Sequence, residues 1–302
     1  MAAARTSDTI LVTGSTGKQG GATARRLLEL GRPVRALVRD PLAPAATALA
    51  AAGAALAVGD FDDPDGLAPA LDGVGAVFAI PPITFEPGVE AARGQALIDA
   101  VAKAGVEQVV FSTVASSSRT GQSAAAKAPI ERHLHDRIRL ATVLRPVRFM
   151  TNYISSGVMG IDGIVDGRHR HLFAPDDPMQ VIALEDVAEF AVLAFADPRR
   201  YAGRTLELAG DQPTPVEAAA AITAATGVEV RYEQLTDEEA DKLGPLVAET
   251  RRRQRAGERW HADIEALRVI HPGLRTFTDW LAQSGAAALR AHLQGGTPAA
   301  GS

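Results

Sequence analysis

Short, uninterrupted apolar runs alternate with longer segments of helical periodicity through the first half of this 302-residue chain. An apolar run without polar alternation predicts a strand that is buried on both faces. Strands that alternate with helices predict a parallel sheet covered on both sides, and six such runs match a doubly wound α/β sheet of the Rossmann type. The predicted strands are 9–12, 34–38, 55–58, 76–80, 108–112 and 141–144, and the predicted helices are 20–31, 45–52, 66–71, 88–104 and 130–136.

The pattern loosens after Pro146, where glycine, aspartate and histidine become frequent. Residues 1–150 are therefore predicted to form a Rossmann dinucleotide-binding domain. Residues 151–290 are predicted to form a smaller α/β lobe on the substrate side, with contacts that interleave with the first domain. Residues 291–302 are expected to be a disordered tail. Within the smaller lobe, helices are expected at 184–196, 215–225 and 237–261.

Composition excludes several classes of function. The formal net charge of −5 argues against a nucleic-acid partner, and the absence of cysteine excludes disulfides, thiolate metal sites and a cysteine nucleophile. No apolar run is long enough to cross a bilayer, and the first residues lack the apolar core of a signal peptide. These features predict a cytoplasmic protein that uses no metal and has no membrane partner.

The strongest local signal is the segment 13–20, Thr-Gly-Ser-Thr-Gly-Lys-Gln-Gly, which directly follows the first predicted strand and opens the first helix. The first glycine allows a tight turn, the second lets the backbone approach a pyrophosphate, and the third lets the helix pack on the strand. The amides at the helix N-terminus favour an anion. The alternative is a glycine-rich turn from strand to helix that binds no ligand. The predicted phosphate-binding residues are Gly14, Thr16, Gly17, Lys18, Gln19 and Gly20.

The end of the second strand predicts which dinucleotide binds. An acidic residue there would bind the ribose 2′-hydroxyl of NAD, whereas an arginine suits the 2′-phosphate of NADP. Arg39 occupies this place, and a guanidinium matches phosphate oxygens well. The sequence therefore favours NADP(H). Asp40 would be the ribose acid if the register were shifted by one residue.

Two motifs resemble one protein family. The loop Thr16–Gly20 and the segment 144–152, Leu-Arg-Pro-Val-Arg-Phe-Met-Thr-Asn, are similar to those of the NmrA-like family of atypical short-chain dehydrogenase/reductases. The resemblance implies a Rossmann fold and an NADP(H) cofactor, with Asp60 and Phe61 beside the adenine. The alternative for these two residues is a turn that caps the next short helix. Pro81, after the fourth strand, is expected over the cofactor at the carboxyl edge of the sheet.

The resemblance also implies catalytic residues and shows one departure. Ser112 and Thr113 would orient the substrate carbonyl, and Lys127 would hold the nicotinamide ribose. Ser123 stands where related enzymes carry the tyrosine that donates a proton, and a serine hydroxyl is too weak an acid for that role. Pro129 predicts that the helix here starts near Lys127. Ser112 and Thr113 can equally be strand-end residues that satisfy the backbone, and Lys127 can be a surface lysine.

The segment after the sixth strand borders the substrate in such folds. Phe149, Asn152 and Tyr153 are therefore the predicted pocket residues, with core packing as the alternative for Phe149. The pairs His133/His135 and His169/His171 lack the further ligands that a zinc site needs. Both pairs are interpreted as solvated residues, although a proton-donor role stays conceivable for His169 and His171.

These features predict an NADPH-dependent reductase of a quinone-like or otherwise conjugated, aromatic small molecule. Such acceptors form a delocalised anion or a neutral product on reduction, so they need less help from an acid. Two alternatives stay open: a non-catalytic NADP(H) redox sensor that acts through a regulatory protein partner, and a pathway enzyme that uses the fold for isomerisation or coupling. A homodimer also stays open. The substrate, the pathway and the proton donor are not determined by the sequence.

Overall fold

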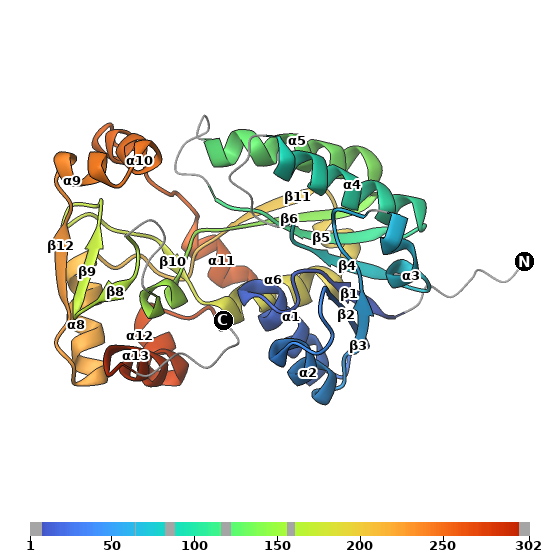
Figure 1. The fold of residues 1–302 in the computed structure, drawn as a ribbon, viewed down its shortest axis with the longest axis horizontal. Coiled ribbons are helices and arrows are strands. Elements are labelled where there is room, and N and C mark those ends of the chain that lie inside the picture. The colour runs from blue at the N-terminus through green and yellow to red at the C-terminus, as the bar shows by residue number, and fades with distance from the viewer. Residues whose placement is uncertain (1–7, 64, 82–87, 116–121, 156–160, 296–302) are drawn as a thin grey trace, which may run out of the picture.

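The computed structural model describes residues 8–63, 65–81, 88–115, 122–155 and 161–295 (Figure 1). A parallel sheet of seven strands forms the larger part, in the order β11-β6-β5-β4-β1-β2-β3. This is the doubly wound order with one strand added at an edge. The strands are β1 (Ile10–Val12), β2 (Val34–Val38), β3 (Ala55–Val58), β4 (Ala76–Ala79), β5 (Gln108–Ser112), β6 (Leu140–Pro146) and β11 (Arg204–Leu208).

Helices cover both faces of this sheet (Figure 1). Ile10 and Val12 point into an apolar core on one face, while Leu11 between them points into the core on the other. This alternation explains why the strands read as continuous apolar runs. The first face carries α1 (Lys18–Glu29), α2 (Pro44–Ala51) and α6 (Leu184–Ala196), and the second carries α3 (Ala68–Leu71), α4 (Val89–Lys103) and α5 (Gln122–Arg137). Among the described residues, no helix has the length and apolarity needed to span a membrane.

The prediction of six strands was wrong by one. Strand β11 comes from the segment expected in the smaller lobe and pairs in parallel with β6. Helix α6, from the same segment, packs against α1. Arg204 and Thr205 at the start of β11 are exposed, because β11 is an edge strand with one neighbour. Its sequence therefore lacks the apolar run that marked the other strands.

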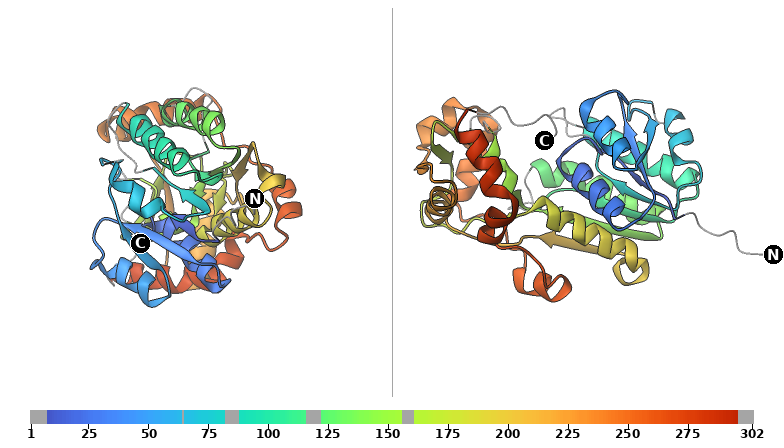
Figure 2. Two further views of the ribbon diagram at one scale, coloured as in Figure 1. Left: turned by 90° about the vertical axis from the view of Figure 1, so that its right-hand side faces the viewer. Right: turned by 90° about the horizontal axis from the view of Figure 1, so that it is seen from below.

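The smaller lobe is formed by residues 150–155, 161–182, 211–261 and 276–293 and lies beside the sheet (Figure 2). Tyr153, Phe277 and Trp280 are fully buried in its core. Its strands are β8 (Ile164–Val165), β9 (Arg168–His171) and β12 (Arg231–Gln234) in one sheet, while β10 (Val181–Ile182) pairs with β7 (Arg148–Phe149). Its helices are η2 (Met150–Ile154), α8 (Pro215–Thr226), α9 (Asp237–Lys242), α10 (Pro245–Arg255), α12 (Phe277–Trp280) and α13 (Ala286–Leu293). Helix α11 (Ile264–Ile270) packs instead against the core that α1, α2 and α6 cover.

Two sequence predictions for this lobe need correction. The single helix expected at 237–261 is divided into α9 and α10, because Gly244 adopts φ +111° and Pro245 starts the second helix. The expected tail begins too early, since α13 is helical up to Leu293. Residues 296–302 of that tail lie outside the described residues.

Helix α5 begins at Gln122, not near Lys127, and Pro129 lies inside it. Proline removes one backbone hydrogen bond, so tertiary packing must compensate. Ile130 is fully buried against α4, and a Cβ atom on Gly94 would lie 2.7 Å from Ile130 Cδ1. Close packing of α4 on α5 at this glycine therefore holds the helix in place.

Replacing this glycine tests the packing. We expect Gly94→Ala to lower the free energy of unfolding by about 1–3 kcal/mol, because the new methyl group overpacks the interface. Ile130→Val in the same background removes Cδ1 and should restore part of the loss. Urea unfolding of the two single variants and the double variant measures the coupling. A stabilised Gly94→Ala, as helix propensity alone would give, would contradict the close approach.

Candidate functional site

The glycine loop between β1 and α1 has the geometry that its sequence predicted. Gly14 adopts φ +57°, a conformation that favours glycine. A Cβ atom on Gly20 would lie 2.2 Å from the Gly14 carbonyl oxygen, so only glycine permits this approach of helix to loop. Helix α1 starts after Gly17 with no capping side chain and no acidic residue in its first turn. Its N-terminal amides and positive dipole end are therefore suited to an anion.

Two hydroxyl groups fix this loop to the sheet. Thr13 Oγ1 accepts a hydrogen bond from the Ile80 amide at 2.8 Å and donates to the Ile80 carbonyl at 3.1 Å. Ser15 Oγ donates to the Leu37 carbonyl at 2.8 Å. The loop is thus tied to the ends of both β4 and β2, which keeps its backbone in place before any ligand binds.

The end of β2 presents Arg39 to solvent. Its side chain is exposed and forms no ion pair or hydrogen bond with another residue in the described part of the chain. The carboxylate of Asp40 instead accepts a hydrogen bond from the Leu42 amide at 2.8 Å, within a local turn. Of the two residues weighed from the sequence, Arg39 has the side chain that is available to a ligand.

The turn after β3 serves a local purpose as well. Asp60 accepts a hydrogen bond from the Asp62 amide at 3.0 Å, and Asp63 accepts from the Gly66 amide at 3.1 Å. Phe61 is half-buried and packs against the core on the α3–α4 face. The expected capping of the next helix is therefore present, while the adenine contacts of Asp60 and Phe61 stay predictions.

A cavity of about 260 Å³ opens between the carboxyl edge of the sheet and the smaller lobe. Most predicted catalytic and substrate residues surround it, together with Gln19 from the glycine loop and Pro81 after β4. The remaining predicted cofactor residues lie along the same sheet edge toward β2 and β3. The lining residues are Gln19, Ile80, Pro81, Ser112, Thr113, Val114, Lys127, Pro146, Val147, Arg148, Phe149, Asn152, Asp162, His171 and Trp260.

The predicted catalytic hydroxyls each have a partner in the wall. Ser112 Oγ donates to Gln19 Oε1 at 2.6 Å, which joins strand β5 to the glycine loop. Thr113 Oγ1 donates to Glu131 Oε1 at 2.9 Å in a buried hydrogen bond. Both hydroxyl protons are therefore directed at side-chain acceptors and not at the backbone, which the alternative for these residues had expected.

Lys127 is not a solvated surface lysine. It reaches the cavity wall from α5 and forms an ion pair with Glu90, whose residue is only 7% exposed. Glu90 lies in the first turn of α4. Glu90 could not be predicted as the partner of Lys127, because the two residues are 37 positions apart and meet only where α4 and α5 pack together.

The smaller lobe contributes a polar wall that sequence reasoning had missed. Arg148 is buried and pairs with the Asp162 carboxylate through Nε, while its Nη2 donates to the Asp162 carbonyl at 2.6 Å. Asn152 Nδ2 donates to Asp162 Oδ2 at 2.7 Å. Burial would raise the pKa of Asp162, but the charges of Arg148 and His171 and the hydrogen bonds from Arg148 and Asn152 outweigh it and lower the pKa to about 2.

Tyr153 does not line the cavity, unlike Phe149 and Asn152. It is fully buried in the lobe core, where its ring contacts Phe277 with the centroids 5.3 Å apart. The Arg148 guanidinium carbon lies 3.9 Å from the Tyr153 ring centroid. The short helix η2 directs Asn152 to the cavity and Tyr153 to the interior.

The interpretation of His169 and His171 as solvated residues was wrong. Both are buried on β9, where they alternate with Arg168 and Arg170, which face outward. Burial lowers the pKa of His171 to about 4, with Asp162 opposing and Arg148 adding to the shift. Burial, followed by the charges of Arg148 and His171, lowers the pKa of His169 well below its usual value. The alternation of arginine and histidine with a period of two was the sequence signal for a strand with an inward histidine face.

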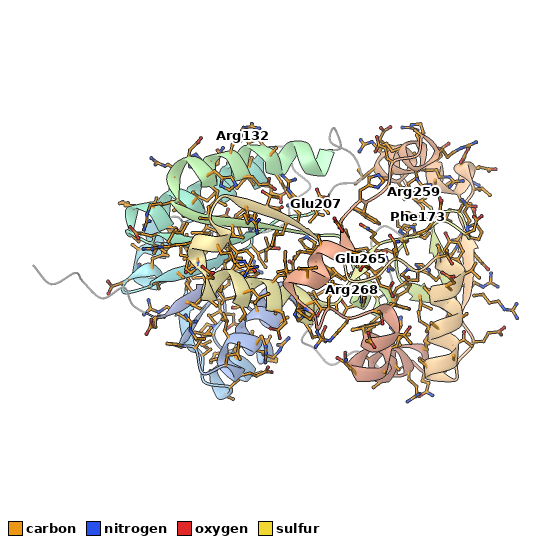
Figure 3. All side chains as sticks on the ribbon, turned by 180° about the vertical axis from the view of Figure 1, so that it is seen from behind. Arg132, Phe173, Glu207, Arg259, Glu265 and Arg268 are labelled. Atoms are coloured by element: carbon orange, nitrogen blue, oxygen red, sulfur yellow. The ribbon has the colours of Figure 1, made fainter. Side chains whose placement is uncertain are left out.

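Trp260 closes the cavity from the segment after α10. Its Nε1 donates to the Ala115 carbonyl at 3.2 Å, which links the lobe to the end of β5. Its ring stacks on Phe173 with the centroids 5.8 Å apart. Arg259 and Phe173 lie side by side in the lobe (Figure 3), with the guanidinium carbon 5.3 Å from the ring centroid. These contacts hold the Trp260 ring at the edge of the cavity, beside the polar wall.

The strand order and the glycine loop place the chain in the Rossmann class of α/β proteins. The model of the NmrA-like family matches residues 6–254. The chain belongs to the NmrA-like family.

Named relatives agree with this assignment. The chain is 32% identical over 241 residues to the NAD(P)H azoreductase of Xenophilus azovorans, covering 76% of this chain and 78% of that protein. It is 30% identical over 289 residues to the (4-alkanoyl-5-oxo-2,5-dihydrofuran-3-yl)methyl phosphate reductase of Streptomyces griseus, covering 91% and 97%. A crystal structure of NmrA, a negative transcriptional regulator, in complex with NADP superposes with a TM-score of 0.77 at 20% identity, covering 95% of this chain and 98% of that one.

The buried histidines make stability depend on pH. The unfolded chain binds more protons than the folded protein between pH 6.5 and about 4, because the folded pKa of His171 is about 4. The free energy of unfolding should therefore fall as the pH is lowered through this window. We expect His171→Gln to reduce the slope by about 1.4 kcal/mol per pH unit near pH 5.

Urea unfolding between pH 4.5 and 7.5 measures this slope. The control is His135→Gln, which replaces an exposed histidine on α5 and should leave the slope unchanged. Equal slopes for the wild type and His171→Gln would show that His171 is not buried as a neutral group.

Proposed function

We propose that this protein is an NADP(H)-dependent reductase that acts on a quinone-like or otherwise conjugated small molecule. The observation that carries the proposal is the cavity, whose two walls come from the glycine-loop side of the sheet and from the smaller lobe. A dinucleotide with its pyrophosphate on the loop would direct its nicotinamide toward the wall formed by Gln19, Pro81 and Ser112. An acceptor would then be held against the lobe wall.

The loop fits a dinucleotide on its own geometry. Its backbone amides are held rigidly and are available to phosphate oxygens. Gly20 has no side chain in the way, the start of α1 has no capping side chain, and the hydroxyls of Thr13 and Ser15 fix the loop to the sheet. Arg39 would hold the ribose 2′-phosphate through a charge-assisted hydrogen bond. When bound, the reduced nicotinamide supplies a hydride.

Lys127 would bind the nicotinamide ribose while paired with Glu90, which fixes the ammonium group at the cavity wall. Ser112 keeps Gln19 in place and so supports the loop from the sheet side. Phe149 and Trp260 supply apolar surface for a flat ring system. Each of these residues binds or orients, and none is a strong acid.

The chemistry of the wall favours conjugated acceptors. Ser123 occupies the position of the usual catalytic tyrosine, and the hydroxyls of Ser112 and Thr113 donate to protein acceptors. A simple ketone would need a proton donor that these groups do not provide. The names of the two relatives, an azoreductase and a reductase of an unsaturated oxo-lactone, describe conjugated substrates and support this class.

A regulatory function is the second candidate. The NmrA structure with NADP belongs to a protein described as a negative transcriptional regulator, so a chain of this fold can bind the dinucleotide for another purpose.

The cofactor preference can be tested by binding. We expect NADPH to bind more tightly than NADH, and Arg39→Ala to weaken NADPH about tenfold or more through loss of a charge-assisted hydrogen bond while leaving NADH unchanged. Equilibrium titration with each nucleotide measures this. Asp40→Asn is the matched control and should change neither affinity. Weaker NADH binding in Asp40→Asn, with no effect of Arg39→Ala, would reverse the assignment to NAD.

Turnover is tested with absorbance at the NADPH band and a panel of quinones, enones and azo dyes. We expect oxidation of NADPH with at least one conjugated acceptor and none with simple aliphatic ketones, because no strong acid faces the cavity. Tight NADPH binding with no consumption by any acceptor would favour the regulatory function instead.

A further inference from the structure

His171 ends strand β9 and lines the cavity on the lobe side. Its Nδ1 is buried and has no hydrogen-bond partner among the described residues. Its Nε2 lies on the side of Asp162, 3.7 Å from Oδ1, which is too far for a hydrogen bond. One edge of the imidazole is therefore enclosed in protein, and the other edge faces the polar wall of the cavity.

The surroundings determine which nitrogen carries the proton. Asp162 is held as a carboxylate by Arg148 and Asn152, so its negative charge attracts a proton on Nε2. A proton on Nδ1 would be a buried donor without an acceptor, which costs more than an unused lone pair. The Nε2–H tautomer is accordingly favoured, and its hydrogen has no protein acceptor within bonding distance in the described structure.

The same surroundings keep the ring neutral. Burial and the Arg148 guanidinium oppose a positive charge, and Asp162 compensates only in part, so the pKa of His171 is about 4. The rings that contact His171 are Phe173, with the centroids 5.3 Å apart, and His169, with the centroids 5.9 Å apart. Tyr153 and Tyr232 contact His169 in turn. A neutral imidazole can donate a hydrogen bond to a carbonyl without a change in its charge.

Most other side-chain donors in the wall already have acceptors. Among the described residues two do not: Arg148 Nη1, which is buried in a guanidinium that lies over the Tyr153 ring, and the amide nitrogen of Gln19 on the glycine-loop side. The hydroxyls of Ser112 and Thr113 donate to Gln19 and Glu131, and the Trp260 indole donates to the Ala115 carbonyl. The Lys127 ammonium pairs with Glu90. An acceptor molecule that binds one of these hydroxyls, the indole or the ammonium would have to break an existing bond, whereas on the lobe side of the cavity a hydrogen bond with His171 breaks none.

We propose that His171 Nε2–H donates a hydrogen bond to the carbonyl oxygen of the acceptor and so determines how the acceptor lies in the cavity. This inference rests on the proposed reductase function. The carboxylate of Asp162 beside the donor repels an anion at this position. The geometry thus selects an uncharged carbonyl group, as in a quinone or an enone, over a carboxylate.

The test measures binding apart from turnover. The probe is 1,4-naphthoquinone, titrated into the NADP⁺-loaded protein while tryptophan fluorescence is followed. Trp260 at the cavity wall contributes to this signal together with the buried Trp280. His171→Leu removes the donor and keeps an apolar side chain of similar size, and we expect it to weaken binding about tenfold. His171→Gln places an amide N–H near the Nε2 position and should retain most of the affinity. With NADPH, kcat/KM should follow the same order.

His169→Leu is the matched control, because His169 is buried on the same face of β9 and does not line the cavity. It should leave naphthoquinone binding within about twofold of the wild type. Thermal unfolding of each variant shows whether it is folded, and His171→Met, which also lacks a donor, carries the test if His171→Leu does not fold.

The outcomes separate this inference from the proposed function. Naphthoquinone binding that weakens in His171→Leu but gives no NADPH oxidation would support the role of His171 and reject the reductase. Turnover by the wild type with unchanged binding and kcat/KM in folded His171→Leu would overturn the inference alone. A wild type that binds no naphthoquinone would overturn it as well, and so would an effect of His169→Leu as large as that of His171→Leu.

Discussion

Apolar side chains enter two cores from opposite faces of one parallel sheet, as Ile10, Val12 and Leu11 do within a single strand. Burial of both faces requires helices on both sides, and because all the strands are parallel, their carboxyl ends lie at the same edge of the sheet. The glycine loop, Arg39, Ser112 and the start of the segment 146–153 meet at that edge for this reason. The position of the candidate site is thus a consequence of how the sheet is covered.

The smaller lobe supplies a different kind of wall. The attraction within a buried ion pair, such as that of Arg148 with Asp162, often does not exceed the free energy lost when both charges leave water. Such a pair therefore contributes little to stability, but it fixes the positions of its side chains. Asp162 also adopts φ +85°, a conformation that an L-residue rarely takes. The strained backbone of Asp162 and the buried charges of Asp162 and Arg148 lie beside His171 at the cavity. The core of the lobe is formed by apolar contacts. This distribution is typical of a site maintained for binding.

Much of the site was readable from local sequence, because its parts are local. The turn at Gly14 and the helix start after Gly17 depend on neighbouring residues, so spacing alone indicated them. His171 was misjudged because its environment comes from Asp162 and Arg148, on other elements. Strand β11 was missed because an edge strand needs no continuous apolar run, and the length of α5 was underestimated because packing against Gly94 overrides the effect of Pro129.

The sequence by itself determined the class of fold, the phosphate loop and the family, since apolar periodicity and glycine spacing act over a few residues. Only the tertiary structure decided which polar groups are engaged and which are free to bind. Three pairs of side chains come together only because different elements of the fold pack against one another. They are Lys127 with Glu90, Thr113 with Glu131, and His171 with Asp162. The physical reason is that burial and charge pairing depend on neighbours in space, and these neighbours exist only after the sheet and the lobe have assembled.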